Sequence, residues 1–263
     1  MNRALNWLPG LAAGQCLPGY PASVRVVDGE LDNRLARFIA VVPDADNPFP
    51  RVRGGEVGLL EGWGLAKAVS EAVAADQHGE KRAIVALIDV PSQAYGRREE
   101  ALGIHQALAG AVEAYAQARL AGHPVIGLLL GKAMSGAFLA HGYQAQRLIA
   151  LDDSGVLVHA MGKAAAARIT LRSVEELEVL AAEIPPMAYD LDSYASLGLL
   201  WRRLSVDSPD SPSSADLAQV RACLADAVRD IGASRDLGSR LAGENRRASR
   251  EVRALLRQQW QEA

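Results

Sequence analysis

The residues that point most directly to chemistry lie in a glycine-containing turn, Lys132-Ala-Met-Ser-Gly-Ala137. An apolar run over residues 125–130 precedes it, and a helical apolar pattern resumes at Phe138, which predicts a buried strand that turns sharply into a helix. The first amides of a helix have no acceptor within the helix, and the helix dipole gives them partial positive charge. Because Gly136 and Ala137 carry almost no side chain, their N–H groups can bind an oxygen that gains negative charge, as in an oxyanion hole.

Two other interpretations of this turn stay open on the sequence alone. Small residues also let a helix pack closely on a sheet, which is a common reason for such turns in α/β proteins. Ser135 is a rival candidate as a covalent nucleophile, but its surroundings match only half of the G-x-S-x-G pattern. No ordered aspartate and histidine elsewhere in the chain complete a catalytic triad with this serine.

A second candidate region is the polar loop in Ile88-Asp-Val-Pro-Ser-Gln-Ala-Tyr-Gly96, which follows another apolar run. Ligands of open α/β sheets gather beyond the carboxyl ends of the strands, where this loop begins. We therefore expect the loop, with Ser92 and Gln93, to form part of an acyl-binding pocket. Asp89 is expected to anchor the loop rather than to act as an acid.

The third candidate region is Val158-His-Ala-Met-Gly162, at the end of a short predicted strand. His159 is expected to be a neutral, hydrogen-bonded residue rather than a catalytic base. The five histidines of the chain have no spacing typical of metal ligands, so no metal site is predicted. Neither a P-loop nor a G-x-G-x-x-G motif is present, so the sequence predicts no bound nucleotide cofactor.

The elements that must position these regions are buried strands in alternation with helices, which predicts an α/β domain over about residues 24–172 and a helical tail. Strands are predicted at 24–27, 35–42, 83–90, 125–130, 147–150 and 155–159. Helices are predicted at 55–75, 99–121, 217–231 and 247–261. Ser173 and Glu176 form a capping box that opens a further helix.

Composition restricts the function classes. The chain has 263 residues, of which 49% are apolar and 22% charged, and a net charge of −3, so it offers no basic field for nucleic acid. Two cysteines far apart in sequence favour a reducing compartment. The first residues are interrupted by Pro9, Gly10 and Gly14, unlike a secretory signal, and no apolar run is long enough for a membrane span. We therefore expect a cytoplasmic protein.

The candidate regions, in their chain order, resemble the C-terminal half of carboxyltransferases of the acyl-CoA carboxylase type. That family has an aliphatic strand with D-V-P-G, a helix ending in Y-A-x-A-x-x-P, the turn K-A-x-G-G-A and a strand followed by x-x-M-G. The corresponding segments here are Ile88–Ser92, Tyr115–Pro124, Lys132–Ala137 and His159–Gly162. Within that superfamily the chain most resembles the gamma subunits of malonate decarboxylase.

The resemblance implies a crotonase/ClpP-like fold, a β-β-α superhelix with a helical C-terminal tail. It implies four segments: a leader over residues 1–23 that wraps on a partner, a carboxyltransferase-like crotonase domain over 24–204, a flexible linker over 205–216 and a helical extension over 217–263.

The resemblance also implies an obligate beta subunit, an acyl carrier protein with a CoA-derived prosthetic group and an alpha subunit that transfers acyl groups. The implied reaction converts malonyl thioester on the carrier to acetyl thioester and CO₂, and no cofactor is bound by this chain itself. The resemblance implies two oxyanion holes that face each other across the subunit interface, with the thioester oxygen held by the beta subunit. Gly136 and Ala137 match the amides of the second hole, which faces the carboxylate or the departing CO₂, with Ser135 where the family has a glycine. Ser92, Gln93, Met161 and Gly162 are implied on the substrate side, with Ser92 again in place of a glycine.

Three functions therefore remain open. The first is a decarboxylase subunit that completes an active site with its partner. The second is the corresponding subunit of a biotin-dependent malonate decarboxylase, in which the carboxyl group passes to biotin. The third is a noncatalytic scaffold of crotonase fold.

Overall fold

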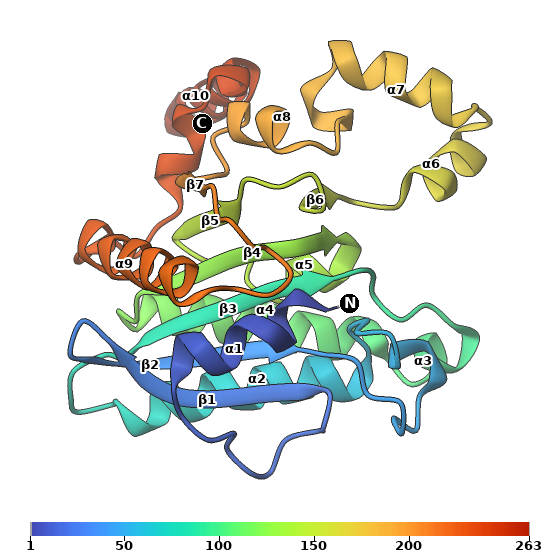
Figure 1. Ribbon diagram of the computed structural model, residues 1–263. Coiled ribbons are helices and arrows are strands. Elements are labelled where there is room, and N and C mark those ends of the chain that lie inside the picture. Colours follow the sequence, from blue (N-terminus) through green and yellow to red (C-terminus); the bar gives the residue numbers. More distant parts are fainter. Residues whose placement is uncertain (1, 263) are drawn as a thin grey trace.

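The computed structural model describes residues 2–262, which build one mixed sheet with helices on both faces (Figure 1). Its strand order is β1-β2-β3-β4-β5-β7, and β6 pairs with the distal part of β4. Only β1 and β2 are antiparallel; the other paired strands run parallel. The strands are β1 (Val24–Leu31), β2 (Arg34–Val41), β3 (Ala83–Val90), β4 (Val125–Met134), β5 (Arg147–Leu151), β6 (Leu157–His159) and β7 (Arg202–Leu204).

Helices cover both faces of this sheet. On one face α2 (Leu59–Ala75) packs against α4 (Ile104–Leu120), and in Figure 1 both lie behind the strands. On the other face α1 (Arg3–Ala12) contacts β2, β3 and β4 and also α9 (Ser214–Ile231). A parallel strand covered on both sides should be apolar throughout, and every residue of β3 is buried, as the sequence predicts.

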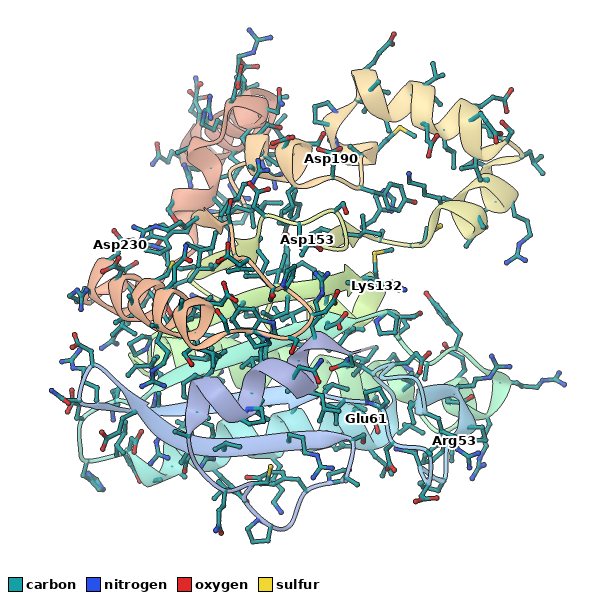
Figure 2. The ribbon with its side chains drawn as sticks, in the orientation of Figure 1. Arg53, Glu61, Lys132, Asp153, Asp190 and Asp230 are labelled. Carbon is teal, nitrogen blue, oxygen red and sulfur yellow. The ribbon has the colours of Figure 1, made fainter. Side chains whose placement is uncertain are left out.

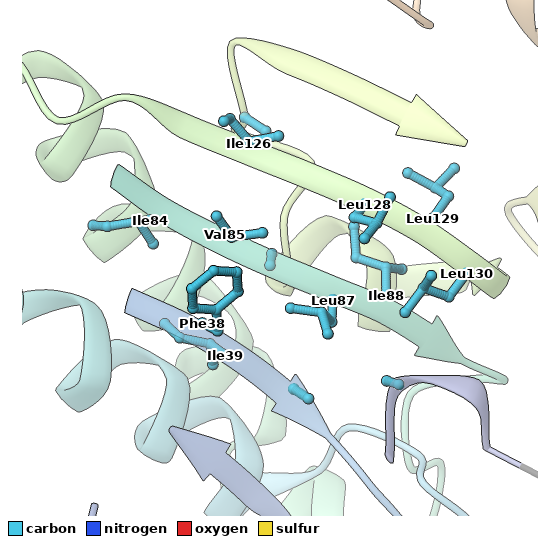
Figure 3. Packing of buried hydrophobic residues seen from close by; sticks show 14 of the residues in the cluster. Phe38, Ile39, Ile84, Val85, Leu87, Ile88, Ile126, Leu128, Leu129 and Leu130 are labelled. Carbon is cyan, nitrogen blue, oxygen red and sulfur yellow. The ribbon is translucent and has the colours of Figure 1, made fainter. Parts of the chain in front are cut away.

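The central strands supply most of the core. Figure 3 shows Phe38 and Ile39 of β2, Ile84 and Leu87 of β3 and Leu128 of β4 close together, and each of these side chains is fully buried. This cluster continues into α1 and α9, so these two helices, far apart in the sequence, share one hydrophobic core with the sheet.

The remaining elements lie outside these layers. The α-helices among them are α3 (Arg97–Ala101), α5 (Ser135–Ala140), α6 (Lys163–Thr170), α7 (Val174–Glu183), α8 (Leu191–Ser196) and α10 (Arg247–Glu262). The 3₁₀ turns are η1 (Pro50–Val52), η2 (Pro185–Met187), η3 (Gly238–Ala242) and η4 (Glu244–Arg246). In Figure 1, α6 and α7 project beyond the sheet as an arm, and α10 lies beside α8. The capping box of Ser173 and Glu176 is present at the start of α7.

The first residues differ from the expected leader, because they contain a helix that packs on this chain's own sheet. Trp7 and Leu11 of α1 are fully buried. The Arg3 amide donates to Asp89 Oδ2 (2.7 Å), and its Nη1 pairs with Asp153 Oδ1 (2.6 Å; Asp153 is labelled in Figure 2). The sequence concealed this helix because Pro9 lies inside it. Contact of this segment with a partner stays a prediction.

The segment 205–216, expected to be a flexible linker, is tied to α1 by hydrogen bonds. Trp7 Nε1 donates to Pro209 O (2.7 Å), and Asn6 Nδ2 donates to Asp210 O (2.7 Å). The long helix expected over residues 99–121 is also divided, because Gly103 has a left-handed backbone (φ 81°) between α3 and α4. Across residues 2–262, no helix combines the length and apolar character needed to cross a membrane.

Candidate active site

The candidate turn follows the part of β4 where one neighbouring strand is exchanged for another. Up to Leu129, β4 pairs with β3 and β5; beyond it, Lys132 and the two residues after it pair with β6 in place of β5, while Ala133 still pairs with Val90 of β3. The register with β3 shifts at this point, so that Leu130, Gly131 and Lys132 stand opposite the single residue Asp89. Such a bulge bends a strand and changes the direction of its remaining residues. Here the bulge lies just before the pair Val90–Ala133 and includes Lys132, which Figure 2 labels.

Asp89 holds this bulge together, as the sequence analysis expects of a structural anchor. Its Oδ1 accepts the Lys132 amide (3.0 Å), and its Oδ2 accepts the Arg3 amide (2.7 Å). A side chain at Gly131 would lie 2.5 Å from the Asp89 carboxyl carbon, so only glycine fits beside it. Asp89 is therefore fully engaged with the backbone of two other segments.

The turn itself is a sharp change from strand to helix. Met134 is extended (φ −115°, ψ 142°), and Ser135, the first residue of α5, has a left-handed backbone (φ 61°). A non-glycine residue in that region is uncommon and carries backbone strain, which is frequently found at functional sites. The amides of Gly136 and Ala137 fall in the first turn of α5, where a helix supplies no acceptor. Within residues 2–262, no backbone hydrogen bond outside the regular elements uses either amide.

Gln93 lies directly over this turn. Its Oε1 accepts a hydrogen bond from Ser135 Oγ (3.3 Å). A Cβ built on Gly136 would overlap Gln93 Oε1 and lie 2.9 Å from Gln93 Cδ, so the position requires glycine while Gln93 stays there. The loop that carries Gln93 is fixed by Val57, whose amide donates to Ser92 O (3.1 Å) and whose carbonyl accepts from the Ala94 amide (2.9 Å). Two of the predicted regions thus meet in space.

A cavity of about 660 Å³ opens at this point. Its walls come from the Gln93 loop, α5, β6, η2, α8 and the residue before α10. The lining residues are Gln93, Tyr95, Ser135, Gly136, Phe138, Leu139, Tyr143, Val158, His159, Ala160, Pro185, Pro186, Met187, Ala188, Tyr194, Leu197 and Arg246. Apolar side chains dominate these walls, and a few polar groups are placed among them, as is usual for small-molecule sites.

The remaining predicted residues lie around the cavity rather than in its wall. Ala137 is fully buried directly after Gly136. Ser92 uses its hydroxyl within its own loop, donating to Gln93 O (2.8 Å). Met161 packs against a small cluster under α6 and α7, and Gly162 caps α6. The cavity therefore brings together Ser135, Gly136 and Gln93, and leaves the other four outside its lining.

His159 is hydrogen-bonded and partly buried, as expected. Its ring stacks on Tyr189 with centroids 3.8 Å apart, and its Nδ1 lies 3.2 Å from the Met161 amide. Burial holds the pKa of His159 below its usual value, so the imidazole is neutral near neutral pH. Met161 thus contributes to the site by holding this ring in place.

Two polar residues of the cavity were missed by the sequence analysis. Tyr194 of α8 is 8% exposed, and its hydroxyl has no hydrogen-bond partner among residues 2–262; burial raises its pKa. Arg246 donates through Nε to Leu197 O (2.9 Å), which directs it to the end of α8. Both come from segments that the sequence marks only as amphipathic or charged, and no motif distinguishes them.

A second cavity of about 540 Å³ lies between β6, α7 and α8 and includes none of the predicted site residues. Its charged groups pair with one another: Arg203 with Asp152 (2.5 Å) and Lys163 with Glu178 (2.7 Å). Among the residues that the structure describes, no three potential metal ligands come together.

Fold and site together define a class. Transcarboxylase 12S superimposes with a TM-score of 0.64 at 20% identity, over 85% of this chain and 40% of that chain. At this identity the match shows the fold alone, and it confirms the predicted crotonase-like α/β fold of carboxyltransferases. Residues 52–260 match the family described as malonate decarboxylase gamma subunit, and this chain belongs to that family.

Solved structures of high similarity agree with this assignment. The relevant chain of a Pseudomonas malonate decarboxylase hetero-tetramer in complex with coenzyme A is 71% identical, with a TM-score of 0.96 over 99% of this chain and 100% of that one. A Pseudomonas MdcD-MdcE hetero-dimer gives 69% identity and a TM-score of 0.92 at the same coverage.

A curated relative from Malonomonas rubra, the malonyl-S-ACP:biotin-protein carboxyltransferase MADD, is 37% identical over 154 residues. The alignment covers 57% of this chain and 53% of that protein, so the match spans about half the length of the curated relative.

Proposed function

We propose that this chain supplies one half of an active site that decarboxylates malonyl thioester on an acyl carrier protein, with a beta subunit supplying the other half. Family membership supports the reaction class. The observation that carries the proposal is the strained turn at Ser135, whose next residue, Gly136, lines a largely apolar cavity of about 660 Å³.

The chemistry requires what this turn offers. The bond between the malonyl carboxylate carbon and the methylene carbon breaks, its electron pair enters the thioester enolate, CO₂ leaves and a proton is then added to the methylene carbon. Amide donors fixed in position stabilise the developing charge, and one such donor is worth about 10²–10³ in kcat. The beta subunit holds the thioester oxygen, and Gly136 and Ala137 provide the donors of the second hole, which faces the carboxylate or the departing CO₂. Ser135 and Gln93 fix the geometry of the turn through their hydrogen bond (3.3 Å).

The acyl group is placed next to the loop that contains Ser92 and Gln93. Met161 and Gly162 act from outside the lining: Met161 holds the imidazole of His159, which does line the pocket, and Gly162 follows it at the start of α6. The apolar walls exclude water from the carboxylate, whose hydration favours the charged ground state.

The implied assembly has four kinds of subunit in the cytoplasm. The beta subunit is the obligate partner, the acyl carrier protein brings the substrate on its CoA-derived prosthetic group, and an alpha subunit transfers acyl groups to the carrier. This chain binds no cofactor, nucleic acid or membrane in the proposed role. The similar Pseudomonas chains belong to a hetero-dimer and a hetero-tetramer, which supports the proposal of a shared site.

The test compares the isolated chain, the complex with the beta subunit, and the same complex with Gly136→Pro. Substrate is malonyl thioester on the carrier, and CO₂ and acetyl thioester are both measured. The isolated chain is expected to be poorly active, and the variant complex is expected to assemble but not to turn over. Full turnover by the variant complex would refute the role of this turn. If every cavity variant turned over normally, the noncatalytic scaffold would be the better account.

A second candidate function is the biotin-dependent version of the same reaction, because the curated relative is a carboxyltransferase to a biotin protein. In that case the carboxyl group passes to biotin on another subunit instead of leaving directly as CO₂. Addition of avidin to the native complex separates the two: inhibition identifies the biotin route, and unchanged turnover identifies direct decarboxylation.

A further inference from the structure

The C-terminal helix α10 (Arg247–Glu262) contributes nothing to the core of this chain. None of its described residues is buried. Its large apolar side chains are among the most exposed of the molecule: Val252 (55%), Leu255 (57%), Leu256 (60%) and Trp260 (87%). We call these four residues the α10 stripe.

The α10 stripe follows helical geometry. Leu255, Leu256 and Trp260 follow Val252 by three, four and eight residues, a spacing that places all four on one side of the helix. Ala254 and Arg257 lie outside the stripe, with Ala254 on the opposite side of the helix. An isolated helix of this length is marginal in water, so a continuous apolar face of this kind ordinarily packs against another surface.

The root of α10 is fixed to the rest of the chain. Arg250 Nη1 donates to Leu241 O (2.7 Å) and to Gly243 O (3.0 Å). Just before the helix, Asn245 Nδ2 donates to Ser196 Oγ (2.8 Å) and Arg246 Nε donates to Leu197 O (2.9 Å), both at the end of α8. The helix is therefore held at its start while its stripe, further along, stays uncovered (Figure 1).

The exposed apolar area of the α10 stripe is large enough to form a substantial part of a stable protein interface. With about 200 Å² for each large apolar side chain when fully exposed, the four exposed fractions amount to roughly 500 Å². This area is within the range of the largest apolar patches of monomers, which are often functional. It is over half of the roughly 800 Å² that each partner contributes to a standard protein interface.

We propose that the α10 stripe is a docking surface for the beta subunit, an inference that rests on the proposed function. The stripe contains no charge and ends in a tryptophan, a composition typical of the buried centre of permanent interfaces. A carrier protein that must leave after each turnover would be recognised mainly through charge, which the stripe does not offer. The similar Pseudomonas chains belong to assemblies with a different subunit, which favours the beta subunit over a second copy of this chain.

The position of α10 agrees with this occupant. Arg246 lines the cavity of the candidate active site and directly precedes Arg247, the first residue of α10. A subunit seated on the stripe therefore lies next to the wall of that cavity. This is where the second half of a shared active site is required.

The test uses two glutamate substitutions with the same charge change on opposite sides of one helix. Leu256→Glu falls in the stripe, and Ala254→Glu is its matched control; both positions are exposed, so the isolated chain should unfold at the same temperature in each case. Affinity for the purified beta subunit is measured directly. We expect Leu256→Glu to weaken binding at least tenfold and Ala254→Glu to leave it unchanged.

Equal affinity of the two variants for the beta subunit would overturn the proposal. The proposal would also be contradicted if light scattering showed that the wild-type chain alone is a dimer and that Leu256→Glu is a monomer, because the stripe would then pair two copies of this chain. Failure of the proposed function is recognised separately: the wild-type complex would form, with the variants ranked as expected, but would release no CO₂ from malonyl thioester.

Discussion

Replacement of Gly136 by alanine tests how closely the candidate turn is built. The added methyl would overlap Gln93 Oε1 and lie 2.9 Å from Gln93 Cδ, so the Gln93 side chain must move. That movement breaks the hydrogen bond from Ser135 Oγ, which is worth about 1 kcal/mol. Alanine is favoured over glycine in a helix by about 0.8–1.0 kcal/mol, so the two effects nearly cancel. The melting temperature of the isolated chain should therefore change by only a few degrees.

Activity is expected to respond differently. The methyl occupies the surface that Gly136 presents to the cavity, and Gln93 no longer fixes the turn. We expect kcat for decarboxylation by the complex to fall about 10²-fold or more, the scale of one lost oxyanion donor. The assay measures CO₂ and acetyl thioester, after size-exclusion chromatography has confirmed that the complex is intact.

Two further variants show which contact is responsible. Gly79→Ala makes the same chemical change at a position with open space around it, and should leave turnover unchanged. The double variant Gln93→Ala/Gly136→Ala removes the collision but keeps the methyl in the cavity, and should remain slow. Wild-type turnover by Gly136→Ala would refute the reasoning, because the turn would then tolerate a side chain where the substrate oxygen should lie.

Three more perturbations test the geometry. Ser135→Gly should leave the free energy of unfolding within about 1 kcal/mol of wild type in urea denaturation, because the relief of left-handed strain (about 1–2 kcal/mol) offsets the loss of the hydrogen bond to Gln93 (about 1 kcal/mol); a loss of more than about 2 kcal/mol would contradict the strain assigned here. Asp89→Asn should lower the free energy of unfolding by about 1–3 kcal/mol, because the asparagine side chain has only one oxygen and cannot accept hydrogen bonds from both backbone N–H groups, of Arg3 and Lys132. An unchanged melting temperature would show that these hydrogen bonds contribute nothing. Burial lowers the pKa of His141 to about 4, so on acidification the unfolded chain takes up a proton at this residue before the folded chain does. The contribution of His141 to the free energy of unfolding should therefore be fully present above pH 6.5 and fall by about 3 kcal/mol as the pH approaches 4. His141→Gln should remove this part of the pH dependence of the free energy of unfolding.

The continuous apolar strands were predictable from the sequence. The strand predicted over residues 83–90 coincides with β3, because a parallel strand covered on both faces must be apolar throughout. The strand predicted over residues 125–130 is correct in place but too short, since β4 continues to Met134. Its last residues pair with β6, a neighbour that only tertiary structure supplies.

Other elements depend on distant contacts that local sequence does not reveal. Helix α1 forms despite Pro9 because Trp7 and Leu11 are buried against the sheet. It also packs closely on α9, since a Cβ at Gly10 would lie only 2.7 Å from Leu217 Cδ2. Helix α6 was missed because no capping side chain marks its start at Gly162.

The candidate site was predictable only where its residues carry local motifs. Ser135, Gly136 and Gln93 lie in such motifs, and the structure brings them together. Tyr194 and Arg246 reach the same cavity from α8 and from the start of α10, and their positions depend on how those helices pack. The hydrogen bond from Arg246 to Leu197 O could not be inferred from spacing in the chain.

The central claim is that the Gly136 amide donates to an oxygen of the reacting malonyl group, at the carboxylate that leaves as CO₂. The most direct measurement replaces the peptide bond between Ser135 and Gly136 by an ester, which removes that one N–H and leaves every side chain in place. We predict that the complex assembles normally and that kcat falls by 10²–10³, equivalent to about 2.7–4 kcal/mol of lost stabilisation. An intact complex of the ester variant that turns over at the wild-type rate would contradict the claim.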